Sequence, residues 1–149
     1  MNHRAAVIAP GEGTPFTVIG HQVAVKIASA DTESGAYTFE LTSPPGAGVP
    51  PHVHQHEDEM IYIVSGECDA IIGDTTTRVG AGAVLDFARG TPHAIFNVGA
   101  DPLVSVWTVT PGANFNAFFN ELSELPEGPP DPAVLVPLFG RYGMTILGP

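Results

Sequence analysis

Residues 46–66 read GAGVPPHVHQHEDEMIYIVSG, and this stretch decides how the rest of the chain is interpreted. His52 and His54 are two positions apart, so on a β-strand both imidazoles point to the same face. After a turn, Glu59 opens the run 60–64, and it shares the parity of the two isoleucines there. We therefore expect its carboxylate to face the core, where it needs a cation or a proton.

A second stretch, residues 82–97, reads GAVLDFARGTPHAIFN. His93 and Asn97 share parity with the apolar Ile95, so an inward His93 could supply a third nitrogen beside the histidine pair. We expect Asn97 to be a hydrogen-bonding residue at a strand end and not a ligand. The remaining histidines have simpler interpretations: His56 is expected to be exposed or next to the ligands, and His21 and His3 are expected to be solvated.

The composition favours one domain, 1–149, of a soluble, cytoplasmic protein. Hydrophobic residues make up 44% of the chain, and 17 Gly and 15 Pro predict many turns. The net charge of -11 disfavours nucleic acid and anionic membranes as partners. No apolar run is long enough for a membrane helix, and Cys68, the only cysteine, is interpreted as a small buried hydrophobe.

The pattern of short alternating runs ended by turn residues is typical of an all-β protein, with a barrel core at about 16–110. Tight hairpins are expected at Ser65-Gly66-Glu67 and at Gly73-Asp74. A helical extension, 113–149, is expected to hold two short helices packed on the barrel: one behind Asn114 as its N-cap, the other opened by Asp131-Pro132. Strands are predicted near 16–19, 22–28, 36–42, 53–55, 60–64, 67–72, 75–79, 83–87, 93–97 and 103–109.

These two stretches resemble the two conserved motifs of the cupin superfamily. The first motif, G-x5-H-x-H-x3-4-E-x6-G, is matched by Gly46, His52, His54, Glu59 and Gly66. The second, G-x5-P-x-G-x2-H-x3-N, is matched by Gly82, Gly90, His93 and Asn97. Ala88 stands where the family has proline, which removes a stiff turn residue but no ligand. The 15 residues between Gly66 and Gly82 are typical of small single-domain microbial cupins.

The resemblance implies a cupin double-stranded β-helix, a jelly-roll barrel of two antiparallel sheets, with the two C-terminal helices added. It further implies one divalent transition metal held by His52, His54, Glu59 and His93. Three imidazoles and a carboxylate suit Fe, Mn, Ni, Co, Cu or Zn without distinguishing among them. The segment 50–67 and the C-terminal helices are similar to bacterial quercetin dioxygenase-like cupins, and the superfamily also implies a homodimer.

The leading functional hypothesis is a metal-dependent dioxygenase that cleaves a small enolic, flavonol-like or diketone-like substrate with dioxygen. Glu59 is the candidate catalytic base as well as a ligand. The pocket for this small molecule is expected to be lined by Ile61, Ile63, Ile95 and Val106. Two alternatives remain: a non-redox metal cupin (isomerase, lyase or polyketide cyclase), or a non-catalytic cupin that binds a small molecule.

Overall fold

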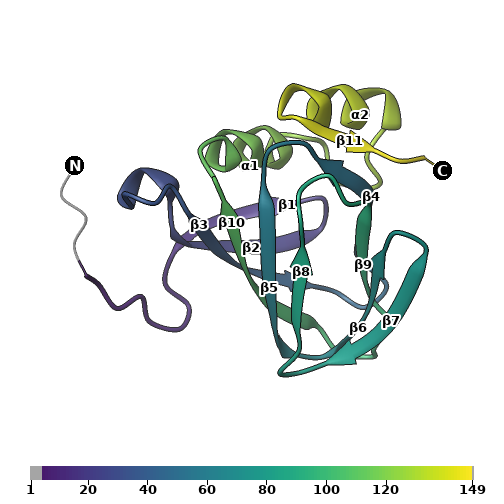
Figure 1. Cartoon of the computed structure of the whole chain (residues 1–149), viewed down its shortest axis with the longest axis horizontal. Helices are drawn as coiled ribbons and strands as arrows, with labels where there is room; N and C mark the ends of the chain where they lie inside the picture. Colours follow the sequence, from purple (N-terminus) through teal and green to yellow (C-terminus); the bar gives the residue numbers. More distant parts are fainter. Residues whose placement is uncertain (1–4, 149) are drawn as a thin grey trace.

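The computed structural model describes residues 5–148 as two antiparallel β-sheets with two helices across one end (Figure 1). The six-stranded sheet runs in the order β1 (Thr14–Val18), β2 (His21–Ile27), β3 (Tyr37–Ser43), β10 (Leu103–Thr110), β5 (Asp58–Ser65) and β8 (Val84–Phe87). The five-stranded sheet runs in the order β11 (Met144–Ile146), β4 (Gly48–His54), β9 (His93–Asn97), β6 (Glu67–Ile72) and β7 (Thr75–Gly80). The helices are η1 (Ser29–Asp31), α1 (Phe115–Ser123) and α2 (Pro132–Arg141). The predicted jelly roll, including all ten predicted strands, is confirmed.

Alternation along the strands builds the core between the sheets. In β3, residues Tyr37, Phe39 and Leu41 are buried, and the residues between them are half-buried on the outer face. In β10 the inward residues include Ser105 and Trp107, whose indole N–H donates to the Ser105 hydroxyl at 2.8 Å. The expectation that Val106 faces inward is therefore wrong. Both parities of β10 carry apolar residues, so alternation alone does not decide its inner face.

The connections at the two predicted hairpins differ. The turn at Gly73-Asp74 joins β6 to β7, which pair directly, so this hairpin is confirmed. The turn at Ser65-Gly66-Glu67 is not a hairpin, because β5 and β6 belong to different sheets. Gly66 has φ +95°, and a Cβ there would lie 2.9 Å from the carbonyl oxygen of Pro102. Only glycine permits this sharp crossing between sheets.

The two C-terminal helices cover one end of the barrel, at the top of Figure 1. As predicted, α2 is capped by Asp131, whose carboxylate accepts from the Ala133 N–H at 2.9 Å. At α1, Asn114 occupies the predicted N-cap position, but its side chain makes no cap hydrogen bond. An exposed ion pair between Arg141 and Glu121, at 2.7 Å, joins the helices. Their buried faces consist of Phe115, Phe118, Phe119, Leu122, Leu135, Leu138 and Phe139.

Strand β11 is an element that the sequence did not predict. It follows α2 and pairs antiparallel with β4, with Met144 opposite His54 and Ile146 opposite His52. Residues 144–146 therefore lie beside the strand that carries the histidine pair. Among residues 5–148, no helix is long and apolar enough to cross a membrane.

Candidate metal centre

Two neighbouring strands of the five-stranded sheet bring three histidines together. His52 and His54 lie on β4 with one residue between them, so both project to the inner face of the sheet. Strand β9 pairs antiparallel with β4, with His93 directly opposite His52. All three imidazoles are buried, with 2–3% of each residue exposed. The inward parity predicted for these residues is the one found.

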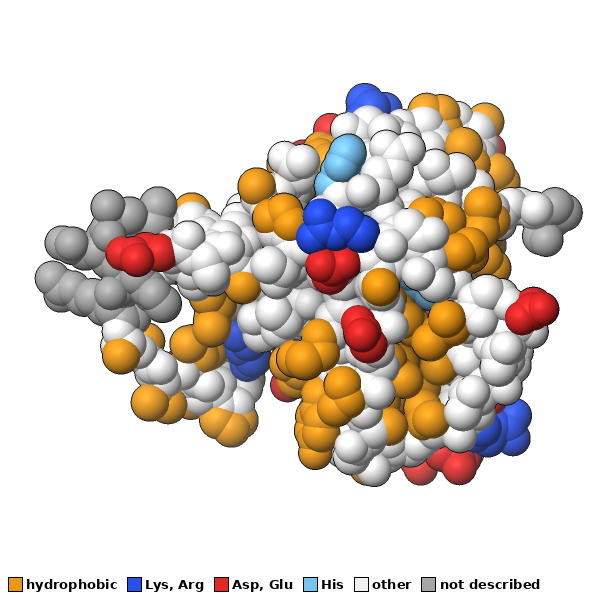
Figure 2. All heavy atoms as spheres, viewed as in Figure 1, with side chains coloured by type: hydrophobic (Ala, Val, Ile, Leu, Met, Phe, Trp, Pro, Cys, Tyr) orange, Lys and Arg blue, Asp and Glu red, His pale blue; other side chains and the backbone are white. Residues whose placement is uncertain are grey.

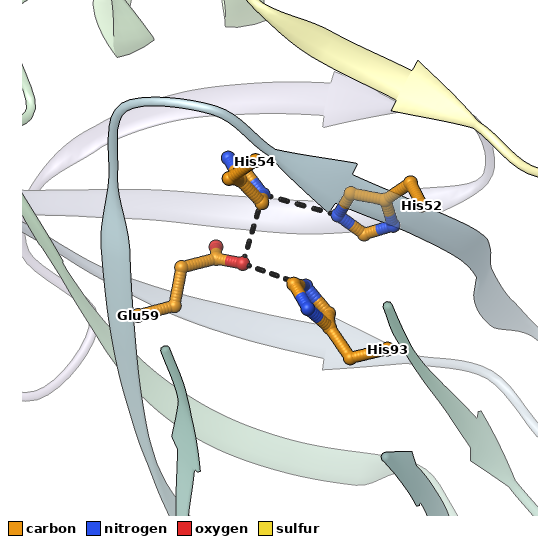
Figure 3. Close-up of side chains that lie close together, drawn as sticks. All are labelled: His52, His54, Glu59 and His93. Carbon is orange, nitrogen blue, oxygen red and sulfur yellow. Dashed lines mark hydrogen bonds and ion pairs between the residues drawn. The ribbon is translucent and has the colours of Figure 1, made fainter. Parts of the chain in front are cut away.

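Glu59 reaches the same point from the opposite sheet. It lies on β5, opposite Val109 of β10 and Phe87 of β8, and is only 2% exposed. Figure 3 shows the four side chains converging. Glu59 Oε1 lies 2.9 Å from His54 Nε2 and 3.1 Å from His93 Nε2, and the Nε2 atoms of His52 and His54 are 3.0 Å apart.

The outer nitrogen of each imidazole has a hydrogen-bond acceptor. His52 Nδ1 donates to the Pro50 carbonyl at 2.8 Å, and His93 Nδ1 donates to the Thr91 carbonyl at 2.9 Å. Because a carbonyl oxygen can only accept, both imidazoles carry a proton on Nδ1. Their Nε2 lone pairs are then directed into the cluster, as metal ligands require.

Glu57 gives His54 a different outer partner, and the sequence did not indicate this role. His54 Nδ1 donates to Glu57 Oε2 at 3.2 Å, and Glu57 is only 4% exposed. Its position three residues after His54, with the parity of Glu59, is the signal that could have identified it. A carboxylate behind a histidine orients the ring and raises its basicity.

The chemistry of the four inner atoms fits a metal ion. One ligand atom from each of His52, His54, Glu59 and His93 lies within 4.8 Å of the others. With each Nδ1 protonated, the three Nε2 atoms and the Glu59 oxygen are all acceptors and lack a donor among themselves. Such a set needs a metal ion or a proton between its atoms to offset their mutual repulsion. Three imidazoles and one carboxylate match the preferences of first-row divalent metals, so the cluster could hold one.

The electrostatics of the cluster favour positive charge between His54 and Glu59. Burial lowers the pKa of His52 to about 4, although Glu59 acts in the opposite direction. Burial also acts to lower the pKa of His54, but the Glu59 and Glu57 carboxylates outweigh it and raise that pKa to about 9. Burial acts to raise the pKa of Glu59, yet His54 and His93 hold it well below its usual range. A metal ion, or otherwise a proton, supplies the charge that this arrangement requires.

Three other polar residues have clear positions. His56 is exposed, as one of its two interpretations stated. Asn97 donates to the carbonyls of Ser43 and Asp101 at 3.0 and 2.9 Å, and so acts as the predicted hydrogen-bonding residue. The expectation of a solvated His21 is wrong: it is 4% exposed, its Nδ1 lies 2.8 Å from the Ser43 hydroxyl, and its Nε2 lies 3.3 Å from the Gly48 carbonyl. His3 lies outside the described residues.

A cavity adjoins the cluster, and His52, His54 and Glu59 form part of its wall. Its remaining walls come from both sheets and from α1, α2 and β11, and they are apolar except for His21. The expected lining by Ile61, Ile63, Ile95 and Val106 is therefore wrong, since none of these residues lines this cavity. The first three fill the core elsewhere. The lining includes Val18, Leu41, Phe39, Trp107, Phe115, Phe118, Phe119, Phe139 and Met144.

Comparisons with known proteins agree with this arrangement. Residues 39–109 match the Cupin domain family, and this segment contains all four residues of the cluster. Residues 39–109 of this chain therefore form a cupin domain. The matched segment ends before α1, so the helices that line the cavity of this cupin lie outside it. A search of curated proteins found no match.

Solved structures similar to this cupin carry several different activities in their names. A predicted oxalate decarboxylase from Thermotoga maritima has a TM-score of 0.64 at 25% identity, covering 70% of this chain and 98% of that one. The polyketide cyclase RemF from Streptomyces resistomycificus has a TM-score of 0.63 at 17% identity, covering 72% and 80%. A sugar phosphate isomerase from Silicibacter pomeroyi has a TM-score of 0.55 at 18% identity, covering 63% and 61%. Likeness at this level extends to the fold and not to a shared reaction.

Proposed function

We propose that this cupin is a metal-dependent dioxygenase that cleaves a small enolic substrate, flavonol-like or diketone-like. In this proposal His52, His54, Glu59 and His93 bind one divalent metal. The observation that carries it is the convergence of four buried acceptor atoms at one end of an apolar cavity. The bound metal would supply Lewis acidity and one-electron redox chemistry beside the substrate.

The chain itself would bind the substrate, exclude water and accept a proton. Glu59 lines the cavity, and both of its contacts with histidines are made by Oε1. This leaves Oε2 as the oxygen that takes the hydroxyl proton of an enolic substrate. The surrounding phenyl rings would keep water from the resulting enolate.

A non-redox reaction is the second candidate, because the fold is similar to that of a polyketide cyclase. Such an isomerase, lyase or cyclase would use the same four side chains without consuming oxygen. The deciding experiment starts with elemental analysis of freshly purified protein. Oxygen uptake is then measured on metal-loaded protein with a β-diketone and with a flavonol. Uptake that depends on both metal and substrate supports the dioxygenase, and turnover without uptake refutes it.

A cytoplasmic homodimer of single-domain chains is the assembly that we propose. Its support is an apolar patch on the outer face of β5 and β8, formed by Met60, Tyr62, Val64 and Val84, each 44–59% exposed. Figure 2 shows hydrophobic side chains gathered over these strands. Exposed apolar patches of this kind mark contact surfaces. Analytical ultracentrifugation of the wild type and of Tyr62→Glu tests this, and a wild-type monomer at all concentrations refutes it.

A further inference from the structure

We propose that the cavity selects a compact, planar, uncharged body carrying one hydroxyketone or diketone edge, and that it excludes three-ring flavonols and polyanions. This inference rests on the proposed metal site and narrows the substrate of the proposed function. It concerns binding alone, so it can be tested without oxygen or turnover.

The size of the cavity limits the ligand to a single ring. The cavity offers about 80 Å³ to the centres of water-sized groups. Pockets that hold drug-sized ligands measure roughly 300–1,000 Å³, so this cavity is far smaller. A single ring with its chelating oxygens fills that space. A flavonol adds a fused ring and a phenyl group, which would have to displace packed side chains of α1 or α2.

The cavity wall lacks free polar groups, which disfavours charged ligands. No Lys or Arg lines the cavity within the described residues. Both nitrogens of His21 already have partners, and the Trp107 N–H donates to Ser105. A dianion or a phosphate could therefore bind the metal ion but would find no further hydrogen-bond donors in the cavity. Removing such an anion from water would cost a large free energy of desolvation. An apolar ring has no charged or polar groups to desolvate, so it does not incur this cost.

The aromatic side chains of the cavity wall favour a planar ligand. The Phe115 ring lies nearly parallel to the His54 ring, with centroids 6.0 Å apart and planes at 17°. Phe139 approaches His52 edge-on at 6.1 Å, and Phe39 stacks with Trp107 at 5.7 Å. Flat rings thus stand beside the imidazoles of the cluster, which favours a planar ligand. Phe115 and Phe139 lie outside the segment that matches the family, so this selectivity belongs to the chain itself.

Maltol and 3-hydroxyflavone form a matched pair for the test, because they share the 3-hydroxy-4-pyranone edge and differ in size. Each is titrated calorimetrically into the zinc-loaded full chain, and zinc content is measured afterwards to exclude extraction of the metal. We expect maltol to bind and 3-hydroxyflavone to bind roughly tenfold or more weakly, since its extra rings overpack the cavity. Oxalate and glucose 6-phosphate should compete with maltol poorly.

Two variants test whether the cavity wall causes the preference for maltol. Phe118→Ala removes a ring from the cavity wall and should narrow or reverse the preference for maltol. Phe96→Ala removes a half-buried ring that does not line the cavity and should leave the preference unchanged. Circular dichroism establishes that both variants fold. The wild-type comparison stands by itself if either variant does not.

The outcomes separate this inference from the proposed function. Binding of 3-hydroxyflavone to the wild type as tightly as maltol, or displacement of maltol by glucose 6-phosphate, overturns the size or polarity argument even where oxygen uptake is observed. Preferential maltol binding without oxygen uptake on any substrate refutes the dioxygenase and supports this inference. Maltol binding that persists in zinc-free His54→Ala refutes the metal-anchored orientation.

Discussion

Glu57→Gln is expected to weaken metal binding although Glu57 does not contact the metal position itself. The carboxylate accepts from His54 Nδ1 at 3.2 Å, and both residues are buried, so solvent screens their interaction little. Removal of such an outer partner costs about 10–100-fold in metal affinity. The glutamine oxygen can still accept the hydrogen bond, so we expect about tenfold for Gln and a loss nearer a hundredfold for Glu57→Ala.

Asp58→Asn provides the matched control. Asp58 is the adjacent residue and loses the same charge, but it pairs with Arg89 on the surface at 2.9 Å and contacts no histidine of the cluster. Zinc affinity is measured for all three variants by competition with a chromogenic chelator at pH 7. If net negative charge near the cluster were the cause, Asp58→Asn would weaken binding as much as Glu57→Gln. Equal affinities in those two variants would show that the Glu57–His54 hydrogen bond does not support the site.

Three further predictions address single residues. Glu59→Gln should retain part of the metal while turnover falls about a hundredfold, measured as oxygen uptake per bound metal, because the general base is lost; parental turnover would refute that role. Burial raises the pKa of the Cys68 thiol to about 11, so native protein should resist alkylation at pH 8, and Cys68→Ser should keep its metal. Burial lowers the pKa of His21 below its usual 6.5. The neutral imidazole therefore contributes fully to the free energy of unfolding above pH 6.5. As the pH falls below 6.5, this contribution decreases by at most about 1.4 kcal/mol per pH unit. Between pH 7 and pH 5 the urea midpoint of the wild type should therefore fall more than that of His21→Gln, and parallel curves would contradict this.

The sequence predicted the features that depend on local spacing. Strand parity was enough to place His52, His54, Glu59 and His93 on inner faces, because each shares its parity with inward neighbours or with its partner histidine. Their grouping as one ligand set came from the resemblance to the cupin motifs, and the structure brings the four together. The same rule failed at Val106, where both faces of the strand are apolar. It also could not separate a hairpin from a crossing between sheets at Gly66, since both require a glycine in a tight turn.

The features that the sequence did not predict depend on distant partners. His21 is buried because its acceptor and donor come from Gly48 and Ser43, which are 27 and 22 residues away. The role of Glu57 as a hydrogen-bond acceptor can be recognised only once His54 is known to be buried with its Nδ1 facing that carboxylate. Strand β11 has three residues and forms because α2 returns the chain beside β4. Local pattern carries no information on any of these three contacts.

The C-terminal segment should affect both the substrate and the metal, which leads to the last prediction. Phe115 and Phe139 contact the imidazoles of the cluster, and β11 pairs with β4 at His52 and His54. Truncation after Gly112 exposes the apolar faces against which both helices pack, so we expect stability to fall by several kcal/mol. Metal affinity should fall as well, because β4 becomes an edge strand. Phe118→Ala, in contrast, changes only the wall and should leave metal affinity intact. Thermal unfolding and zinc competition measured on both proteins test this: an unchanged melting temperature after truncation would show that the helices do not contribute to the packed core.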